Sequence, residues 1–337
     1  MKTGLVLGKF APFHRGHAHL IETALGEMDR VVVLVYQALR TTRVPLDVRA
    51  GWIRAFFEKR YPGRVEVMEA AGGPEETGLD TRTIALQNEY LRKRLFGRSF
   101  DTFYSSEAYG EHVSWALGCR NRPIDPSRKE VRVSASVIRR CPEDFGALAL
   151  APREYVLRRL VLLGGPSTGK STLAEGLGAE INEPVAREYG REYWFEHQDN
   201  HRLSMEDLEI IARRQIGQVD PHAVSRARNL VIHDGSPLTT LCYARYYFGQ
   251  VSEALRRICD EYCARDNLIH VVCGEDIPFE DSWDRSGPGS RRELQALNLR
   301  ELEERGLEYE LIEGDPVERI HRITTILEQR RAECPDC

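Results

Sequence analysis

The first half of the chain alternates short apolar runs with amphipathic segments. Residues 4–10 and 31–35 predict two buried strands, and residues 19–25 between them have the spacing of a helix. A strand, a helix and a second parallel strand form the unit from which parallel sheets are built. Further strands are predicted at residues 65–68, 102–104 and 131–133. This half is therefore expected to be a parallel sheet covered by helices.

The second half repeats the pattern. Apolar runs predict strands at residues 160–163, 184–186, 230–234 and 267–273, and amphipathic helices are expected at about 204–228, 236–248, 251–265 and 315–331. The periodicity lapses around residues 141–153, where we place a domain boundary at about 150. The predicted fold class is α/β, with two doubly wound parallel-sheet domains at 1–150 and 151–332 and a short tail at 333–337.

A phosphate-binding loop follows the first strand of the second half. It consists of Gly164, Gly165, Pro166, Ser167, Thr168, Gly169, Lys170, Ser171 and Thr172. The glycines let backbone N–H groups point at an anion, Lys170 reaches the outer phosphates of ATP, and the Ser171 hydroxyl is placed to bind Mg²⁺. The helix that starts near Lys170 adds its positive end. An ordinary glycine-rich turn is the alternative.

Two further features of this half suit phosphoryl transfer. Asp234 ends an apolar strand, where a carboxylate binds Mg²⁺ through water or accepts a proton from the attacking hydroxyl. Its alternative role is to cap the next helix. Arginines 285, 291 and 292 follow a turn rich in Gly, Pro and Ser and predict a lid over the phosphates. A solvated run of arginines is the alternative.

The first half carries the motif G-x-F-x-P-x-H-x-G-H. Its fixed positions are Gly8, Phe10, Pro12, His14, Gly16 and His17. Two imidazoles and several N–H groups at a helix start surround one small volume, which suits a triphosphate. A metal site at the two histidines is the competing interpretation, but carboxylates and thiolates are absent nearby.

Composition excludes some classes of function. The chain has 337 residues, 42% of them hydrophobic, and a net charge of −5. A nucleic-acid-binding protein would need clustered Lys and Arg, so we expect no nucleic-acid partner. There is no signal peptide or long apolar run, so we expect a cytoplasmic protein without membrane contact. The eight cysteines are expected to be reduced, with Cys334 and Cys337 in a frayed tail; a metal or redox pair there is the alternative.

The first-half motif resembles the H-x-G-H signature of adenylyltransferases and cytidylyltransferases. Residues 133–139 resemble the late I-S-x-T-x-I-R motif of that superfamily, with Ser136 in place of the usual threonine. The resemblance implies a Rossmann-like nucleotidyltransferase domain. It also implies an ATP site formed by Gly8, Lys9, Phe10, His14, His17, Ser134, Ser136 and Arg139.

The whole chain resembles the NadR family, in which a nicotinamide mononucleotide adenylyltransferase precedes a ribosylnicotinamide kinase with a P-loop. The substrates implied are ATP, nicotinamide riboside and nicotinamide mononucleotide, with Mg²⁺ as cofactor and NAD as product. The resemblance makes Asp234 the base and assigns Arg285 and Pro278 to the lid. It assigns substrate contacts to Glu188, Arg191, Asp234 and Phe279.

The sequence departs from the family at three places. The N-terminal helix-turn-helix of the enterobacterial members is missing, so we expect no repressor role. Phe279 stands where tryptophan is usual. The aromatic residue that contacts nicotinamide in the family has no clear counterpart in the 80–90 region, where Ile84 and Tyr90 are only candidates. Two other interpretations stay open: a two-step salvage enzyme for another small phosphorylated substrate, and a nucleotide-sensing regulator. The sequence leaves open whether the chain forms a homo-oligomer.

Overall fold

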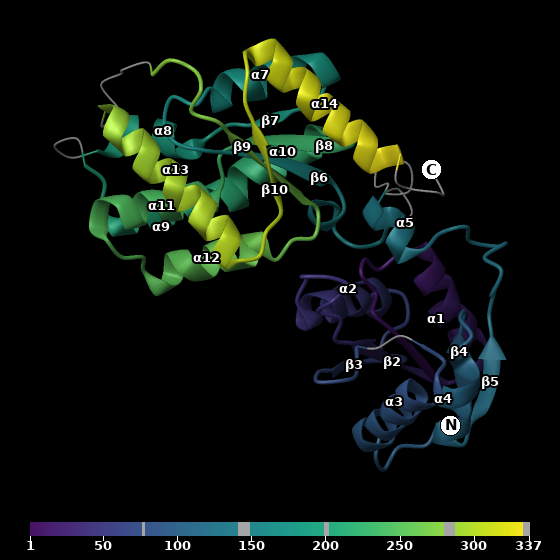
Figure 1. Ribbon diagram of the computed structural model, residues 1–337. Helices are drawn as coiled ribbons and strands as arrows, with labels where there is room; N and C mark the ends of the chain where they lie inside the picture. Colours follow the sequence, from purple (N-terminus) through teal and green to yellow (C-terminus); the bar gives the residue numbers. More distant parts are fainter. Residues whose placement is uncertain (76–77, 141–148, 199–201, 280–286, 333–337) are drawn as a thin grey trace. The chain divides into compact units, whose positions relative to one another are not determined.

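The computed structural model describes residues 1–75, 78–140, 149–198, 202–279 and 287–332. The chain divides into two compact units, Met1–Val156 and Leu157–Cys337. Each unit contains one parallel five-stranded sheet with helices on both faces (Figure 1). The prediction of two doubly wound parallel sheets is confirmed. The predicted boundary at about 150 lies a few residues before the observed division.

The N-terminal unit has the strand order β3-β2-β1-β4-β5, and all neighbours are parallel. Its strands are β1 (Thr3–Gly8), β2 (Arg30–Tyr36), β3 (Val65–Ala70), β4 (Thr102–Ser105) and β5 (Arg120–Pro123). Its helices are α1 (Arg15–Glu27), α2 (Leu46–Glu58), α3 (Thr81–Arg94), α4 (Gly110–Leu117) and α5 (Ala135–Arg140). In such a sheet, ligands bind outside the carboxyl ends of the strands, where connections leave β1 and β4 in opposite directions.

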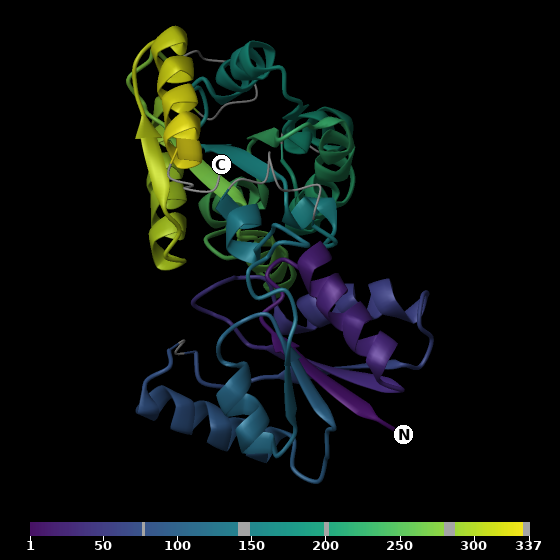
Figure 2. The ribbon, with the colours of Figure 1, turned by 90° about the vertical axis from the view of Figure 1, so that its right-hand side faces the viewer.

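Alternate residues of the central strands face opposite helix layers. Val31 and Val33 of β2 pack in one cluster with α1 and α2, whereas Val32 and Leu34 pack in another with α3 and α4. Figure 2 shows the two helix layers on either side of this sheet. Because both faces are covered, the strands are almost continuously apolar, as buried parallel strands are.

The predicted strand at residues 131–133 is wrong, and the edge strand is β5 instead. The Asp125 carboxylate accepts hydrogen bonds from the backbone N–H groups of Lys129, Glu130 and Val131, at 2.7, 3.0 and 3.1 Å. This side chain therefore satisfies backbone groups that a strand would have paired with a neighbour. The sequence of β5 is polar because the strand lies at an exposed edge.

The C-terminal unit has the strand order β10-β9-β6-β8-β7, again all parallel. Its strands are β6 (Arg158–Leu163), β7 (Val185–Ala186), β8 (Leu230–Asp234), β9 (Leu268–Cys273) and β10 (Tyr309–Ile312). Its helices are α7 (Lys170–Ile181), α8 (Tyr189–His197), α9 (Met205–Arg214), α10 (Asp220–Arg226), α11 (Pro237–Phe248), α12 (Glu253–Cys263), α13 (Gly287–Glu304) and α14 (Pro316–Ala332). The helix expected at 204–228 is α9, a π-helical turn (Gln215–Val219) and α10 in direct succession.

The β6 strand shows how the two faces of this sheet are buried. Leu160 and Leu162 pack with α7 and α14, and Val161 and Leu163 pack with α11, α12 and α13. Figure 1 shows these two helix layers on opposite sides of the sheet. The strand carries the chain directly into residues 164–169, so a rigid core element positions the phosphate-binding loop.

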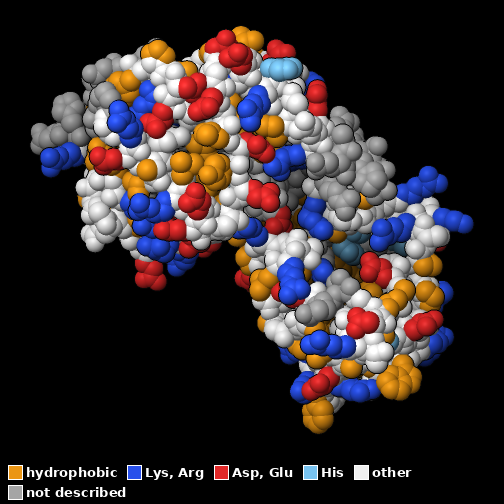
Figure 3. All heavy atoms as spheres, viewed as in Figure 1, with side chains coloured by type: hydrophobic (Ala, Val, Ile, Leu, Met, Phe, Trp, Pro, Cys, Tyr) orange, Lys and Arg blue, Asp and Glu red, His pale blue; other side chains and the backbone are white. Residues whose placement is uncertain are grey.

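Charged side chains of both signs are interspersed on the face of the molecule shown in Figure 3. Among the described helices, none combines the length and apolar character needed to cross a membrane.

Candidate active sites

The first candidate site is a cavity of about 600 Å³ in the N-terminal unit. Every residue predicted for the adenylyltransferase site lines it: Gly8, Lys9, Phe10, His14, His17, Ser134, Ser136 and Arg139. These residues come from the end of β1, the start of α1 and the start of α5. The structure therefore brings together two motifs that are more than a hundred residues apart in the sequence.

His14 and His17 are paired by the start of α1. His14 caps the helix, and its Nδ1 accepts a hydrogen bond from the backbone N–H of His17 at 3.4 Å. The two rings are stacked with their centroids 3.6 Å apart. A Cβ added to Gly16 would lie 3.1 Å from Cε1 of His14, so any larger residue would press on the stacked ring.

Both imidazoles are held neutral. Burial, with Arg128 and Arg139 nearby, lowers the pKa of His14 to about 3. Burial, then His14 and Arg128, lowers the pKa of His17 well below its usual value. Nδ1 of His17 is buried and has no hydrogen-bond partner among the described residues.

Other polar groups around this cavity are fixed by the fold. The hydroxyls of Ser134 and Ser136 are 2.8 Å apart, and the Arg139 guanidinium donates to the Ala11 carbonyl. Lys9 Nζ donates to Thr41 Oγ1 at 3.0 Å. Burial and then Arg139 lower the pKa of Lys9. Cations and hydroxyls that converge on one cavity suit a polyphosphate.

Sequence reasoning missed Arg49 as a support of this site. Its guanidinium, on α2, is buried and donates to the carbonyls of Lys9, Tyr36 and Val44. It thereby joins the loop after β1 to the end of β2. The candidates for an aromatic contact also change, because Tyr36 and Tyr109 line the cavity whereas Ile84 and Tyr90 are not among its lining residues.

The second candidate site is a cavity of about 1090 Å³ in the C-terminal unit. Nine of the residues predicted for the kinase site line it: Pro166, Ser167, Thr168, Gly169, Lys170, Ser171, Thr172, Glu188 and Arg191. Gly164, Gly165, Asp234 and Phe279 are not among the described residues that line it. Arg285 lies outside the described residues, as do Cys334 and Cys337.

The loop after β6 has the backbone that its glycines permit. Gly164 and Gly169 have φ values of +137° and +80°, a region that favours glycine. Gly169 caps α7, and Lys170 is the first residue of that helix. Lys170 Nζ donates to the carbonyls of Gly164 and Gly165 at 3.0 and 2.8 Å, which keeps the ammonium group over the loop.

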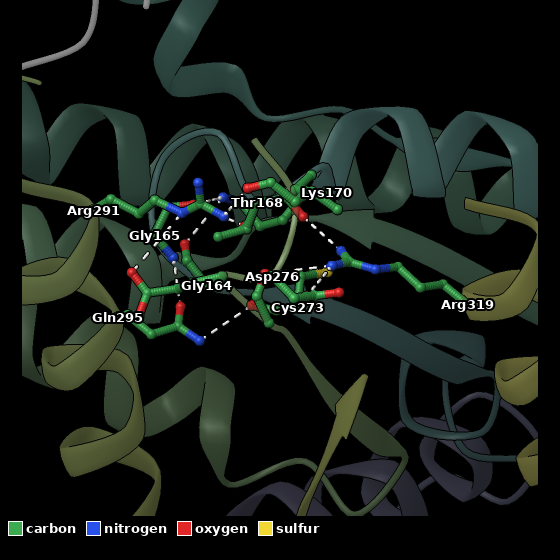
Figure 4. A network of polar contacts seen from close by, with 12 residues as sticks. Gly164, Gly165, Thr168, Lys170, Cys273, Asp276, Arg291, Gln295 and Arg319 are labelled. Atoms are coloured by element: carbon green, nitrogen blue, oxygen red, sulfur yellow. Dashed lines mark hydrogen bonds and ion pairs between the residues drawn. The ribbon is translucent and has the colours of Figure 1, made fainter. Parts of the chain in front are cut away.

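Polar side chains from other elements hold this loop from behind (Figure 4). Gln295 on α13 accepts a hydrogen bond from the Gly165 N–H at 2.8 Å. Arg319 on α14 donates to the Thr168 carbonyl at 2.7 Å and to Asp276 at 2.6 Å. The two contacts to the loop have no local sequence signal, because Gln295 and Gly165 are 130 positions apart and Arg319 and Thr168 are 151 positions apart.

Arg291 was expected in a lid but packs behind the loop. Its side chain is buried and donates to the Ile277 carbonyl at 2.9 Å (Figure 4). Arg292 is exposed. Ser290, Leu294 and Gln295 on α13 are buried as well, so this part of the helix faces the core. The spacing of the arginines alone could not distinguish a lid from a buried helix face.

Asp234 lies at the carboxyl end of β8, paired in register with Leu162 of β6. It is 6% exposed, and its Oδ1 is buried with no hydrogen-bond partner in the part of the chain that the structure describes. A buried carboxylate oxygen requires a partner, and a hydrated cation supplies one. Asp234 and Ser171 of the loop therefore fit Mg²⁺ bound at this end of the sheet.

An aromatic wall lines the same cavity and was not predicted. It consists of Trp194, Phe195, Tyr243, Tyr247 and Phe248. The rings of Tyr243 and Tyr247 are stacked, with centroids 6.0 Å apart. Their spacing of four residues on a predicted helix was the available signal. Such rings suit a flat heteroaromatic ligand.

Two family models match the two units. Residues 5–141 match the cytidylyltransferase-like family, and residues 159–319 match the AAA domain. Fold and sites together define a protein with two nucleotide-binding domains, the first cytidylyltransferase-like and the second of the P-loop class. The predicted combination of a nucleotidyltransferase-like domain and a P-loop domain is confirmed.

The chain is homologous to NadR. It is 28% identical to the trifunctional NAD biosynthesis/regulator protein NadR of Escherichia coli (strain K12), over 93% of this chain and 79% of that protein. It is also 28% identical to NadR of Salmonella typhimurium, over 91% of this chain and 77% of that protein. Crystal structures of NadR protein with NAD and AMP-PNP and with NR share the fold, each with a TM-score of 0.58. They are 21% and 22% identical to this chain, and each comparison covers 98% of it and 96% of the NadR chain.

Proposed function

We propose that this chain is a bifunctional enzyme that converts nicotinamide riboside to NAD in two steps. The C-terminal unit phosphorylates nicotinamide riboside with ATP, and the N-terminal unit adenylylates the resulting nicotinamide mononucleotide with a second ATP and releases pyrophosphate. The observation that carries this proposal is that each unit has its own cavity, lined by a phosphate-binding motif at the carboxyl ends of its strands. Homology to proteins named for NAD biosynthesis supports the choice of substrate.

In the kinase step, the protein positions two substrates and neutralises charge. Lys170 and the N–H groups of the loop bind the outer phosphates of ATP. The Ser171 hydroxyl and the Asp234 carboxylate would hold Mg²⁺, which when bound would supply positive charge for the phosphates. Asp234 accepts the proton of the riboside 5′-hydroxyl as that oxygen attacks the γ-phosphorus. The bond between the γ-phosphorus and the β-phosphate oxygen breaks, and ADP leaves. Glu188 and Arg191, which line the cavity, contact the acceptor.

In the adenylyl transfer, no covalent enzyme intermediate is needed. The phosphate of the mononucleotide attacks the α-phosphorus of ATP, and pyrophosphate leaves. His14 and His17 donate hydrogen bonds as neutral imidazoles, and Ser134, Ser136 and Arg139 bind the leaving phosphates. Most of the acceleration then comes from orientation and from stabilisation of the developing charge.

Paired variants test the assignment of one activity to each unit. We expect His17→Ala to abolish NAD formation from the mononucleotide while riboside phosphorylation continues. We expect Lys170→Ala to do the reverse, because the two residues line separate cavities. Each activity is measured in the full chain with its own substrate and Mg²⁺-ATP. Loss of both activities in either single variant would contradict the proposal.

A further inference from the structure

Two buried glutamines in the C-terminal unit each hold two backbone groups with their side-chain amide. Gln215 begins the π-helical turn after α9, and Gln295 lies on α13. They are 4% and 6% exposed. In each, the amide oxygen accepts from one backbone N–H and the amide nitrogen donates to another backbone carbonyl. Such a side chain fixes the spacing between its two partners.

Gln215 holds both sides of Glu188. Its Oε1 accepts from the Tyr189 N–H at 2.8 Å, and its Nε2 donates to the Arg187 carbonyl at 3.2 Å. Glu188 between these contacts lines the cavity, and its Cγ lies 3.7 Å from where a Cβ on Gly235 would be. Gly235 directly follows Asp234, the proposed base. The two hydrogen bonds of Gln215, which we call its clamp, therefore hold Glu188 beside the end of β8.

Gln295 holds the first turn of the phosphate-binding loop (Figure 4). Its Oε1 accepts from the Gly165 N–H at 2.8 Å, and its Nε2 donates to the Cys273 carbonyl at 3.1 Å. The Gly165 carbonyl, like that of Gly164, also accepts a hydrogen bond from Lys170 Nζ. Gln295 therefore ties the loop, at the point that holds its lysine, to the end of β9.

We propose that Gln215 and Gln295 are positioning residues that serve one substrate each, Gln215 the phosphoryl acceptor and Gln295 the ATP phosphates. The inference rests on the proposed kinase function of this unit. The two clamps lie on different elements and hold different segments. Removing one glutamine side chain should therefore weaken the binding of one substrate and leave the binding of the other unchanged. A general loss of stability would weaken the binding of both.

Methionine is the appropriate replacement at both positions. It keeps the length and approximate shape of glutamine and removes both the donor and the acceptor. Glutamate tests the donor separately, because its carboxylate still accepts from the N–H but cannot donate to the carbonyl. Gln218 lies on the same π-helical turn as Gln215 and is exposed, so Gln218→Met is the matched control.

The experiment measures steady-state kinase kinetics of the full chain with Mg²⁺-ATP and nicotinamide riboside. For Gln215→Met and Gln215→Glu we expect the KM for the riboside to rise about tenfold, as for loss of a buried hydrogen bond, with the KM for ATP unchanged. For Gln295→Met we expect the dissociation constant of Mg²⁺-ATP, by calorimetry, to rise about tenfold with the riboside KM unchanged. Gln218→Met should match the wild type in all of these values.

Equal changes in the constants for both substrates, in Gln215→Met or in Gln295→Met, would overturn the proposal. Constants unchanged from the wild type in either variant would overturn it too. A wild-type chain that does not phosphorylate nicotinamide riboside would contradict the proposed substrate instead. Calorimetry with Mg²⁺-ATP then still tests Gln295, and hydrogen exchange at the Tyr189 amide in Gln215→Met tests Gln215. Exchange no faster than in Gln218→Met would show that Gln215 does not hold this segment.

Discussion

The stacked imidazoles of His14 and His17 are a pair that the structure keeps uncharged. Protonation of either imidazole would place a buried positive charge near arginine side chains, Arg128 and Arg139. The two histidines therefore bind the extra proton in the folded state only at low pH. Neutral rings still donate hydrogen bonds to phosphate oxygens. In the proposed adenylyl transfer, the pair therefore provides hydrogen-bond donors that need no change of protonation at neutral pH.

This pair makes the N-terminal unit sensitive to mild acid. The pKa of His14 is about 3 in the folded chain, against 6.5 for an unperturbed histidine. Below pH 6.5 the unfolded state binds more protons, so stability is lost as the pH falls from 6.5 toward 3. The expected loss for His14 is about 1.4 kcal/mol per pH unit within that window.

Urea unfolding of the wild type and His14→Gln, between pH 7.5 and 5, checks this expectation before most carboxylates titrate. Hydrogen exchange in residues 1–156 reports the unfolding of this unit. We expect a shallower pH dependence in His14→Gln. Equal slopes in the two proteins would show that His14 is not held neutral.

Asp220 joins a second buried cluster, in the C-terminal unit. Its carboxylate contacts Arg159 at 2.8 Å, Arg265 at 2.8 Å and His233 at 3.3 Å. Burial alone would raise the pKa of Asp220, but hydrogen bonds from His233 and Arg159 lower it below the usual range. The carboxylate therefore stays charged and balances two guanidinium groups.

Removing this charge should be costly. Asp220→Asn leaves Arg159, which is fully buried, without its ionic partner, and we expect a loss of about 3–5 kcal/mol in unfolding free energy. Asp260→Asn is the control, because its ion pair with Arg305 has an Asp260 side chain that is 56% exposed. That variant should lose at most about 1 kcal/mol by urea unfolding. Similar losses in the two variants would contradict the role given to the buried cluster.

A functional residue could be predicted from the sequence when its partners are close to it in the sequence. His14, His17 and Lys170 lie in motifs whose members are close in sequence, so spacing alone indicated them. Arg49 and Gln295 act through partners that are distant in sequence, and a glutamine on an amphipathic helix carries no local sign that its amide is buried.

At the scale of elements, the contact between α13 and the phosphate-binding loop depends on a glycine. A Cβ on Gly165 would lie 2.4 Å from the Arg291 carbonyl oxygen, which is backbone and cannot rotate away. We expect Gly165→Ala to displace the loop and weaken Mg²⁺-ATP binding about tenfold or more, as overpacking of 1–3 kcal/mol implies.

Gly289→Ala is the control for this contact. Gly289 lies on the same helix, and a Cβ there would have no described neighbour within 4 Å. Calorimetric titration with Mg²⁺-ATP should give the wild-type dissociation constant for this variant. An unchanged constant in Gly165→Ala would show that the close approach of α13 does not shape the loop.

Elements were predictable where burial dictates an apolar pattern. The central strands of both sheets, β1, β2, β6, β8 and β9, were expected because both of their faces are covered. The edge strand β5 has the polar sequence Arg120–Pro123 and was missed, whereas residues 131–133 were wrongly taken as a strand. The Asp125 carboxylate accepts hydrogen bonds from the backbone N–H groups of residues 129–131, which a strand would have paired with a neighbouring strand.

At the scale of the whole molecule, the chain contains two cavities that we propose as nucleotide sites, and they share none of the described lining residues. One site is organised by the start of α1 and the other by the start of α7. The proposed product of the C-terminal site is a substrate of the N-terminal site. The proposed two-step reaction therefore requires both units, the C-terminal unit acting first.

The most direct test is a time course of the purified full chain with Mg²⁺-ATP and nicotinamide riboside, in which chromatography follows the mononucleotide and NAD. The account predicts that the mononucleotide appears first and that NAD follows with release of pyrophosphate. Formation of the mononucleotide alone would contradict the activity assigned to the N-terminal unit, and formation of neither product would contradict the proposed substrate.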